Sequence, residues 1–524
     1  MDAAIGRDRR IVHHAAARPV GREPGTRPYV VVVGAGIAGL TAATGLAERG
    51  IEVEVIEGQE YLGGRVGGWT DALPDGTTIA MNRGFHAFFR QYYNLRQLLR
   101  RTDPLLQRMT RVDDYPLVDA EGRRDSFRRL PLTPPWNALA FAARSRTFPL
   151  HELWRLDARA AAPLAMVSVP AIYEQLDHVD AETFLRKIKF PVAARHLAFE
   201  VFSRSFFAPP TQMSAAELAA MFHIYFLGSS EGLLFDVPTS NYDTALWSPL
   251  SEYLAARGAR IRTGTTVTRV QTGGNRTFRV HDDVGGVVDA DAVVLATDVA
   301  GLCRIVADSP DLGDSDWRSR IHALRSAPPF LVHRLWLDRP VAQERPAFLA
   351  TGGMPPLDNI SVLDRYEDQA RDWAERHNGA VVELHAYALS EVRTPEFERE
   401  IRGQLLARLH HLYPETAEAR IVGEQVLWRQ DCPLFGVGDH AARPPVRTPH
   451  DKLMLAGDGI RIDLPVALME RAATTGWTAA NALLTQWGLS GHDLYTVPTT
   501  GRHAVLRRLA AREMSKAAIQ EESV

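Results

Sequence analysis

Cysteine is scarce in this chain of 524 residues. The two that occur, Cys303 and Cys432, exclude a disulfide-stapled scaffold and a zinc or iron–sulfur site built from cysteines. We therefore expect no metal site and a reducing, cytoplasmic location. Lysine is scarce as well, with four residues beside 56 arginines, which we interpret as a coding bias rather than a functional feature.

Long hydrophobic runs and an excess of positive charge are also missing. The longest uncharged apolar runs, residues 130–143 and 160–173, have 14 residues each and contain proline, whereas a membrane-spanning helix needs about 20 residues. Residues 1–28 lack the apolar stretch of a signal peptide and are expected to form a flexible tail, and residues 491–524 are assigned to a C-terminal tail. The net charge of −3 predicts no basic surface, so we expect no nucleic-acid partner.

The chain does have an ordinary globular composition, with 45% hydrophobic and 23% charged residues, and its length predicts at least two domains. The first folded segment begins with a β-branched run at residues 29–33, which is typical of a buried strand. A glycine-rich turn, a helical stretch at residues 40–49 and a second strand-like stretch at residues 51–56 follow. This order predicts a parallel βαβ unit of a Rossmann-type α/β fold.

The glycine-rich turn has the spacing of a dinucleotide-binding loop. Gly34 allows the tight turn, Gly36 lets the backbone approach a pyrophosphate, and Gly39 lets the helix pack closely on the strand. The helix N-terminus, with Ile37 and Ala38, offers N–H groups to the phosphates. The turn therefore predicts a dinucleotide cofactor.

Glu57 ends the second strand, where a carboxylate accepts hydrogen bonds from a ribose diol. A second glycine turn with Gly64 and Arg65 follows within a few residues and resembles the GG motif of flavoproteins with two dinucleotide-binding domains. In that family the glycine backbone and the arginine contact the pyrophosphate of FAD, and an arginine can bond phosphate oxygens in pairs. The resemblance implies noncovalent FAD rather than NAD.

Further pieces of the FAD pattern lie far along the chain. Asp458 stands in a Leu-Ala-Gly-Asp segment that resembles the family's last FAD motif, and the resemblance implies that it accepts a hydrogen bond from a ribityl hydroxyl. The next helix, expected from Val466 to Leu484, then points its N-terminus at the flavin. The strand around Val267 matches the family's adenine-side strand. The sequence departs from the family at residues 469–471, Met-Glu-Arg, where many relatives carry small residues.

Because the nucleotide-binding pieces occur at the start, the middle and the end of the chain, we expect interleaved domains. The FAD-binding domain, a parallel sheet with a β-meander, is assigned to residues 29–100, 245–305 and 426–490. A mixed sheet-and-helix domain for substrate and membrane contact takes residues 101–244 and 306–425. The predicted fold class is therefore α/β, a two-dinucleotide-binding-domain FAD fold interleaved with a substrate domain.

Three other segments carry a closer resemblance. Residues 81–94 are related to a segment of the phytoene and ζ-carotene desaturases, with a Gly-X-His core followed by aromatic residues and Tyr-X-Asn. Together with residues 200–207 and 222–232, they resemble the isorenieratene synthases. These are carotene β-ring desaturase/methyltransferases within the carotenoid desaturase and amine oxidase superfamily.

This resemblance implies an FAD-dependent oxidoreductase that converts β-ionone rings of β-carotene or γ-carotene into aromatic φ-rings. The reaction combines desaturation with a 1,2-shift of a ring methyl group, and the electron acceptor is expected to be a quinone or oxygen. The resemblance also implies that Arg83, Gly84, Phe85 and His86 lie beside the flavin.

Three alternatives remain open at this point. One is an acyclic carotenoid desaturase of the phytoene or lycopene type. Another is a flavin amine oxidase, although such enzymes commonly place a lysine near the flavin and this chain has none between Lys189 and Lys452. The third is a non-enzymatic protein that binds a carotenoid or lipid and uses FAD as a structural group.

Aromatisation also needs a base, because protons must leave the ring as each double bond forms. Four residues are candidates, and we expect His86 and Glu231 to face the same ring pocket. Each has a structural alternative: His86 as an anchor of the flavin loop, and the acids as turn or helix-capping residues. The candidates are His86, Glu231, Asp236 and Asp463.

A long apolar substrate needs an apolar channel and access to a membrane. Residues 184–238 are rich in phenylalanine and are expected to wall this channel or to fill a core. Residues 136–159 combine arginines with aromatic residues such as Trp136, Phe141 and Trp154. That mixture suits a helix in the membrane interface or one packed on the core, so we expect peripheral membrane contact.

Overall fold

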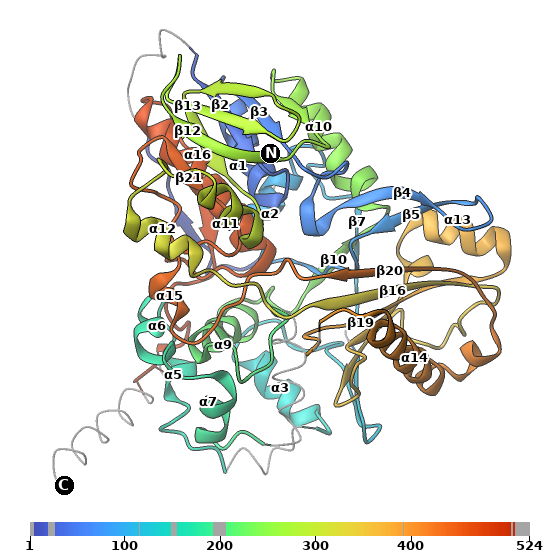
Figure 1. Cartoon of the computed structure of the whole chain (residues 1–524). Helices are drawn as coiled ribbons and strands as arrows, with labels where there is room; N and C mark the ends of the chain where they lie inside the picture. The colour runs from blue at the N-terminus through green and yellow to red at the C-terminus, as the bar shows by residue number, and fades with distance from the viewer. Residues whose placement is uncertain are drawn as a thin grey trace.

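Figure 1 shows the computed structural model of the chain, which describes residues 5–18, 27–114, 116–147, 155–191, 206–390, 392–504 and 507–508. A parallel sheet with its helices forms the upper part of the view, a long mixed sheet extends to the right, and short helices form the lower part. The two sheets meet at a cavity, because residues of both line it.

The parallel sheet has five strands in the order β11-β3-β2-β15-β21, and every neighbouring pair is parallel. Its central strand β2 is buried at every residue, as expected when helices or other elements cover both faces. This arrangement confirms the predicted Rossmann-type fold. The strands are β2 (Tyr29–Val33), β3 (Glu52–Ile56), β11 (Arg260–Arg262), β15 (Ala292–Leu295) and β21 (Leu453–Leu455).

Helices α1 (Ile37–Ala47) and α16 (Leu468–Gln486) pack closely on one another beside this sheet. A Cβ added at Gly45 of α1 would lie 2.8 Å from a side chain of α16. One added at Gly476 of α16 would lie 2.3 Å from the carbonyl oxygen of Ala38. The two helices therefore meet through residues that must remain small.

A three-stranded antiparallel meander and four helices complete this part of the molecule. Strand β11 joins the parallel sheet, whereas β12, which contains Val267, joins the meander. Gly264 lies between them with φ +62°, and its N–H donates to the carbonyl of Gln59 at 3.0 Å. The elements are α2 (Tyr93–Leu99), α10 (Ser248–Ala255), α11 (Val299–Ala307), α12 (Ser315–His322), β12 (Val267–Thr272), β13 (Phe278–Asp282) and β14 (Val287–Ala290).

The mixed sheet has seven strands in the order β20-β16-β19-β18-β17-β8-β9. Helix α14 (Pro395–Leu412) buries its apolar residues against this sheet, while α13 (Asp368–His377) contacts β19 and the hairpin of β4 and β5. The expected domain boundary at residues 425 and 426 falls inside β20. The seven strands are β8 (Leu117–Asp119), β9 (Arg124–Asp125), β16 (Phe330–Leu337), β17 (Phe348–Gly352), β18 (Asn359–Val362), β19 (Ala380–Ala386) and β20 (Ile421–Arg429). The separate hairpin consists of β4 (Gly68–Ala72) and β5 (Thr78–Asn82).

Short helices and a small sheet in the order β6-β10-β7 lie between these two parts and below them. Two π-helical segments occur in the same part of the sequence, His223–Leu227 directly after α9 and Asp243–Trp247 directly before α10. The helices and strands of this region are α3 (Trp136–Arg144), α5 (Ala162–Ala165), α6 (Ala171–Leu176), α7 (Ala181–Lys187), α9 (Ala215–Phe222), α15 (Asp439–Ala442), β6 (Phe88–Phe89), β7 (Met109–Arg111) and β10 (Phe235–Pro238).

The expected interfacial helix over residues 136–159 is shorter than predicted. Helix α3 ends at Arg144, and Ser145 is already extended. Trp136 and Leu139 of this helix are 63% and 48% exposed, whereas Phe141 stacks on Phe127 with ring centres 4.7 Å apart. Trp154 lies outside the described residues. Among the described helices, none combines the length and apolar character required to cross a membrane.

The N-terminal segment that was expected to be a flexible tail is partly ordered, which corrects that expectation. Strand β1 (Val12–His14) pairs antiparallel with β22 (Leu494–Thr496). Asp8 is buried and forms an ion pair with Arg502 at 2.6 Å. Residues 8–14 therefore contact residues 494–502 through backbone and side chains.

The close approach of α1 to β2 leads to a first prediction. In Gly39→Ala the new Cβ would lie 1.9 Å from the carbonyl oxygen of Gly34, so the helix must move away from the strand. We expect a loss of about 1–3 kcal/mol in the free energy of unfolding of the cofactor-free protein, measured with urea. Gly36→Ala is the matched control, because a Cβ there meets nothing within 4 Å. Equal unfolding midpoints for Gly39→Ala and the wild type would contradict this packing.

Candidate active site

A cavity of about 850 Å³ opens between the carboxyl ends of the parallel strands and the mixed sheet. The expected cofactor residues that line it come from the N-terminal glycine turns, from the middle of the chain and from the last FAD motif near the C-terminus. Residues of β16, β19 and the chain after β20 line it as well. The expected cofactor residues on its wall are Gly34, Gly36, Ile37, Ala38, Glu57, Gly64, Arg65, Arg83, Phe85, His86, Val267 and Asp458.

The two glycine turns form one continuous wall of this cavity. Gly34 has φ +101°, and a Cβ there would lie 2.6 Å from the carbonyl oxygen of Ala296. The N–H of Gly63 donates to the carbonyl of Ala35 at 2.9 Å, which joins the second turn to the first. Gly36 faces open space. The backbone at this point can therefore be approached closely by a ligand.

Glu57 is fixed at the end of β3. One carboxylate oxygen accepts the N–H of Ala35 at 2.6 Å, and the other accepts the N–H of Gln59 at 2.8 Å. Burial raises the pKa of Glu57, with the nearby Asp298 acting in the same direction. Each carboxylate oxygen keeps a further lone pair for a hydroxyl donor.

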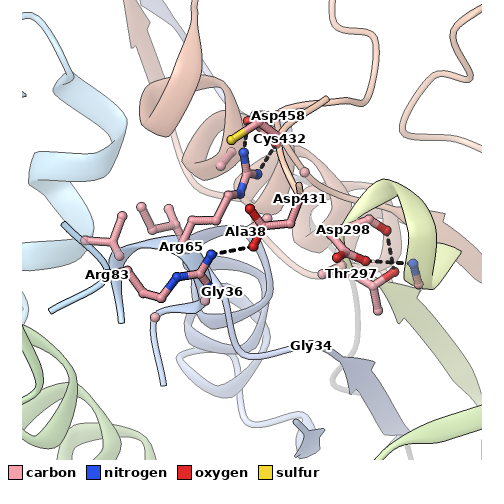
Figure 2. A pocket seen from close by; sticks show the side chains of 18 of the residues that line it. Gly34, Gly36, Ala38, Arg65, Arg83, Thr297, Asp298, Asp431, Cys432 and Asp458 are labelled. Atoms are coloured by element: carbon pink, nitrogen blue, oxygen red, sulfur yellow. Dashed lines mark hydrogen bonds and ion pairs between the residues drawn. The ribbon is translucent and has the colours of Figure 1, made fainter. Parts of the chain in front are cut away.

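Two ion pairs cross the cavity wall, as Figure 2 shows. Arg65 donates to both carboxylate oxygens of Asp458, at 2.9 and 2.5 Å. Arg83 donates to Asp431 at 2.5 Å and to the hydroxyl of Tyr61 at 3.3 Å. The Nε of Arg83 and one oxygen of Asp431 are buried with no hydrogen-bond partner among the described residues. The wall therefore holds polar atoms suited to a polar ligand.

The start of helix α16 shows how the unusual Met-Glu-Arg sequence is accommodated. Leu468 and Met469 line the cavity, whereas the next two side chains lie elsewhere. Glu470 accepts the N–H groups of Asn94 and Leu95 at 2.8 and 2.9 Å, and burial raises its pKa to about 8. Arg471 forms a buried ion pair with Glu217. The large residues thus anchor neighbouring segments, and the helix N-terminus remains beside the cavity.

Three expected cofactor residues do not line the cavity. Gly39 packs against Gly34, as its spacing predicts. Gly84 has φ +118° and lies beneath His385, since a Cβ added there would lie 3.1 Å from that ring. Val466 is buried, and its carbonyl accepts the Nε of Arg471 at 3.0 Å.

Of the four candidate bases, His86 alone is among the described residues that line the cavity. Its backbone N–H donates to the hydroxyl of Tyr242 at 3.0 Å, and its Nδ1 lies 2.8 Å from the carbonyl oxygen of Gly84. Since a carbonyl only accepts, Nδ1 carries the hydrogen. Burial lowers the pKa of His86 to about 4, so the ring is neutral at pH 7.

The other three candidates lie elsewhere, and the expectation that Glu231 faces the same pocket as His86 is corrected. Glu231 is buried and accepts the N–H groups of Arg7 and Asp8 at 2.9 and 3.2 Å. It therefore holds the N-terminal segment, a partner that the local sequence around Glu231 does not reveal. Asp236 forms ion pairs with Arg90, at 2.7 Å, and with Arg96, while Asp463 is exposed.

The phenylalanine-rich stretch mostly fills a core. Phe206 and Phe235 are buried among core residues, and Phe207 is its one described phenylalanine on the cavity wall. Phe199 and Phe202 lie outside the described residues.

Sequence reasoning missed several residues on the cavity wall. Thr297 and Asp298 follow β15, the neighbour of β2 in the parallel sheet, so the strand order would have pointed to them. Asp431 and Cys432 follow β20, and burial raises the pKa of the Cys432 thiol to about 12. The others are His385 and Tyr387 at the end of β19, Phe330 and Val332 of β16, and Phe89 and Tyr92.

Comparison with known proteins identifies the family. The model of the flavin-containing amine oxidoreductases matches residues 37–484. The chain belongs to this family. It is 56% identical to a carotenoid phi-ring synthase of Streptomyces griseus over 509 residues, which covers 97% of each chain. It is 26% identical to a carotenoid phi-ring synthase of Chlorobaculum tepidum over 91% of each chain. It is 27% identical to a zeta-carotene desaturase of Synechocystis over 87% of this chain and 97% of that protein.

Solved structures of this flavoprotein family share the fold. The cyclohexylamine oxidase of Brevibacterium oxydans superposes with a TM-score of 0.64 and 16% sequence identity, covering 88% of this chain and 99% of that one. At this identity the likeness concerns the fold, which is the predicted one.

The cavity fits the family's flavin. Its volume of about 850 Å³ lies within the range of about 300–1,000 Å³ that is usual for cofactor pockets. The open backbone at Gly36 suits a pyrophosphate, and the unpaired buried atoms of Arg83 and Asp431 suit a polar ring system. The family match and this fit confirm FAD as the cofactor.

The position of Glu57 leads to a second prediction. Glu57→Ala removes a charged hydrogen-bond acceptor, so we expect FAD affinity to fall about 10- to 150-fold, measured by flavin fluorescence titration. Glu52→Ala is the control, because Glu52 is exposed on the same strand. Burial raises the pKa of Glu57. As the pH is lowered, the wild-type affinity for FAD should therefore begin to fall at a higher pH than it would with a glutamate of ordinary pKa. Unchanged affinity of Glu57→Ala would contradict the assignment.

Proposed function

We propose that this protein is an FAD-dependent carotenoid oxidoreductase that converts β-ionone rings of β-carotene or γ-carotene into aromatic φ-rings. The observation that carries the proposal is the 56% identity to a carotenoid phi-ring synthase across 97% of both chains. Apolar and aromatic side chains on the cavity wall support it, because a carotenoid ring end needs a greasy environment. They include Phe85, Phe89, Tyr92, Phe207, Phe330 and Val332.

The same cavity supports the cofactor contacts proposed here. The glycine turns at Gly36 and Gly64 hold the pyrophosphate, and Glu57 binds the adenosine ribose. Asp458 accepts a hydrogen bond from the ribityl chain while remaining paired with Arg65. The N-terminus of α16 stabilises negative charge at the flavin.

The bound flavin supplies a hydride acceptor. The protein must then exclude water, hold the ring against the flavin, and receive the protons that leave as each double bond forms. His86 lies on the cavity wall in its neutral form and provides a polar contact beside the flavin. A quinone or oxygen is the proposed acceptor of the electrons from the reduced flavin.

The two rival enzyme activities are less well supported. A zeta-carotene desaturase matches at 27% identity, about half the value found for the phi-ring synthase. An amine oxidase commonly places a lysine near its flavin, and this sequence has none between Lys189 and Lys452.

Expression in a β-carotene-producing host tests the function. We expect pigments with one or two trimethylphenyl rings, identified by chromatography and mass. Gly36→Val is the matched control, since its side chain would enter the open space where the cofactor binds. Formation of acyclic desaturation products in a phytoene-producing host, without aromatic rings from β-carotene, would favour the desaturase instead. Carotene binding without anaerobic bleaching of the flavin would indicate a binding protein.

We also propose peripheral membrane contact at α3 and the residues before it. Leu132, Trp136 and Leu139 are 50%, 63% and 48% exposed. Arg144 ends this helix, and arginines beside exposed apolar residues suit the surface of an anionic membrane. This contact would bring the protein to the bilayer that holds its substrate.

Vesicle sedimentation tests this contact. The triple variant Leu132→Ser, Trp136→Ser and Leu139→Ser should lose most of its binding to anionic liposomes while its melting temperature stays unchanged. The control is Val284→Ser with Val287→Ser, which are exposed apolar residues near another turn, at 74% and 53%. A bound fraction equal to that of the wild type would count against α3 as the contact.

A further inference from the structure

Strand β19 and the residue after it carry a row of polar side chains that leads to the cavity. Residues at every second position of a strand share a face, which places Glu383, His385 and Tyr387 in one line. The Nε2 of His385 lies 2.7 Å from a carboxylate oxygen of Glu383, and its Nδ1 lies 2.5 Å from the hydroxyl of Tyr387. His385 and Tyr387 both line the cavity, whereas Glu383 is buried behind them.

Glu383 is held as a carboxylate. Burial alone would raise its pKa, but the charge of Arg334 and the hydrogen bond from His385 outweigh burial and lower the pKa to about 2. Arg334 donates to one oxygen from Nε and Nη2 at 2.9 and 2.7 Å, and the N–H of Phe85 donates to the other at 2.7 Å. The position and ionisation of this carboxylate are therefore fixed by its surroundings.

The ionised carboxylate determines the tautomer of His385. Because Glu383 can only accept, Nε2 carries the hydrogen and Nδ1 keeps its lone pair. Nδ1 therefore accepts the hydrogen bond of the Tyr387 hydroxyl. The side-chain N–H of Asn359 also donates to this hydroxyl, at 3.1 Å, and helps to orient it.

We propose that Glu383, His385 and Tyr387 form a proton relay that receives the protons leaving the substrate ring, a role that rests on the function proposed above. Tyr387 is the catalytic group that contacts the ring, because it lies on the cavity wall among Phe207 and Phe330, with ring centres 4.7 and 6.5 Å away. His385 takes the proton of the hydroxyl at Nδ1, and Glu383 stabilises the resulting imidazolium.

The atoms and electrons of the step balance. In each of the two desaturations of a ring, one C–H bond breaks and its electron pair leaves as hydride to the oxidised flavin, which a quinone or oxygen later restores. In one of the two desaturations, a ring methyl group then moves with its bonding electron pair from the geminal carbon to the neighbouring cationic carbon. A second C–H bond then breaks, and its electron pair forms the new double bond. The proton passes to the oxygen of Tyr387 while the original hydroxyl proton moves to Nδ1 of His385, so the tyrosine stays neutral. The imidazolium proton leaves to water before the next step.

His86 is less suited to this role although it lies on the same wall. Its Nδ1–H donates to the carbonyl of Gly84, and no carboxylate of the described residues lies within hydrogen-bond distance of its ring. A proton on Nε2 would thus lack the support that Glu383 gives to His385.

Several other charged or titratable groups lie near this relay. Arg334 reaches it from β16, and His86 and Arg83 reach it from the segment after β5. Asp358 accepts the N–H of Tyr387 at 2.6 Å. The test of the relay must therefore compare variants with the wild type rather than interpret one rate by itself.

The central experiment compares Tyr387→Phe with the wild type in single-turnover formation of φ-rings by the holoenzyme. Losing a positioned proton acceptor should slow aromatic product formation about 10²- to 10⁴-fold, with FAD content, carotene binding and melting temperature unchanged. The matched control is Tyr413→Phe, which removes a buried hydroxyl bonded to the carbonyl of Pro346 at 2.8 Å, away from the cavity. It should retain the wild-type rate.

A spectroscopic readout separates proton transfer from a structural role. In the resting holoenzyme, ¹⁵N NMR of labelled histidine, assigned by difference from His385→Gln, should show a protonated Nε2 and an unprotonated Nδ1. Tyr387→Phe should then shift the Nδ1 signal.

The outcomes are distinguishable. If the wild type makes φ-rings and Tyr387→Phe stays within threefold of its rate, the relay is wrong and the proposed function stands. A protonated Nδ1 in the resting enzyme would also overturn the relay. If the wild type makes no aromatic rings, both proposals fail.

Discussion

The buried ion pair between Arg334 and Glu383 lies on two neighbouring strands of the mixed sheet and holds the loop that carries residues into the cavity. Their side chains are 1% and 0% exposed, and the remaining donors and acceptors around them are used as well. Arg334 donates to the carbonyl of Ala80 at 3.1 Å, and Glu383 accepts the N–H of Phe85. Removing one member of such a pair leaves an uncompensated buried charge, which is far more costly than an exposed substitution.

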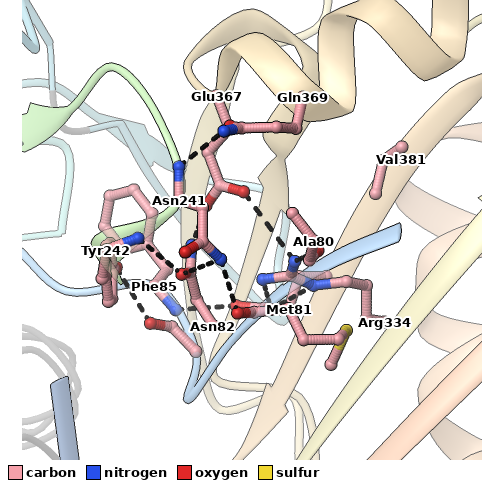
Figure 3. A network of polar contacts seen from close by, with 12 residues as sticks. Ala80, Met81, Asn82, Phe85, Asn241, Tyr242, Arg334, Glu367, Gln369 and Val381 are labelled. Atoms are coloured by element: carbon pink, nitrogen blue, oxygen red, sulfur yellow. Dashed lines mark hydrogen bonds and ion pairs between the residues drawn. The ribbon is translucent and has the colours of Figure 1, made fainter. Parts of the chain in front are cut away.

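The network continues to the other side of the same loop, as Figure 3 shows. Asn82 donates to Glu367 at 2.7 Å, and its side-chain oxygen accepts the N–H of Tyr242 at 2.9 Å. Tyr242 in turn donates to the carbonyl of Gly84 at 3.0 Å. The loop that positions Arg83 and His86 is therefore fixed by polar contacts from several distant parts of the chain. Such satisfied networks specify a single arrangement.

The cofactor half of the site was predictable from the sequence because its chemistry follows local spacing. Gly34, Gly36, Glu57 and Arg65 lie within two short segments, and each segment forms its own turn around a strand end. Asp458 was also predictable by resemblance, although its pairing with Arg65 was not. The substrate half follows no local pattern. Its wall comes from strands whose order in the mixed sheet does not follow the chain order, so no spacing rule joins them.

The acids of the phenylalanine-rich stretch show why sequence reasoning selected candidate bases that lie away from the cavity. Glu231 and Asp236 look catalytic when only their neighbours in sequence are considered. Their partners are Arg7, Asp8, Arg90 and Arg96, and the first two lie in a segment that was expected to be a loose tail. The same type of side chain, a carboxylate, can either bind backbone N–H groups or accept protons from a substrate. Only the tertiary structure distinguishes them.

The order of strands in the parallel sheet also has a consequence for biosynthesis. Strands β2 and β3 leave the ribosome early, β15 follows far behind, and β21 comes near the end. At about 5–20 residues per second, a gap of about 400 residues between β2 and β21 takes roughly 20–80 s. During that interval the apolar strands have neither their last neighbour nor helix α16 to cover them. FAD therefore cannot be fully enclosed until translation has passed Asp458 and the start of α16.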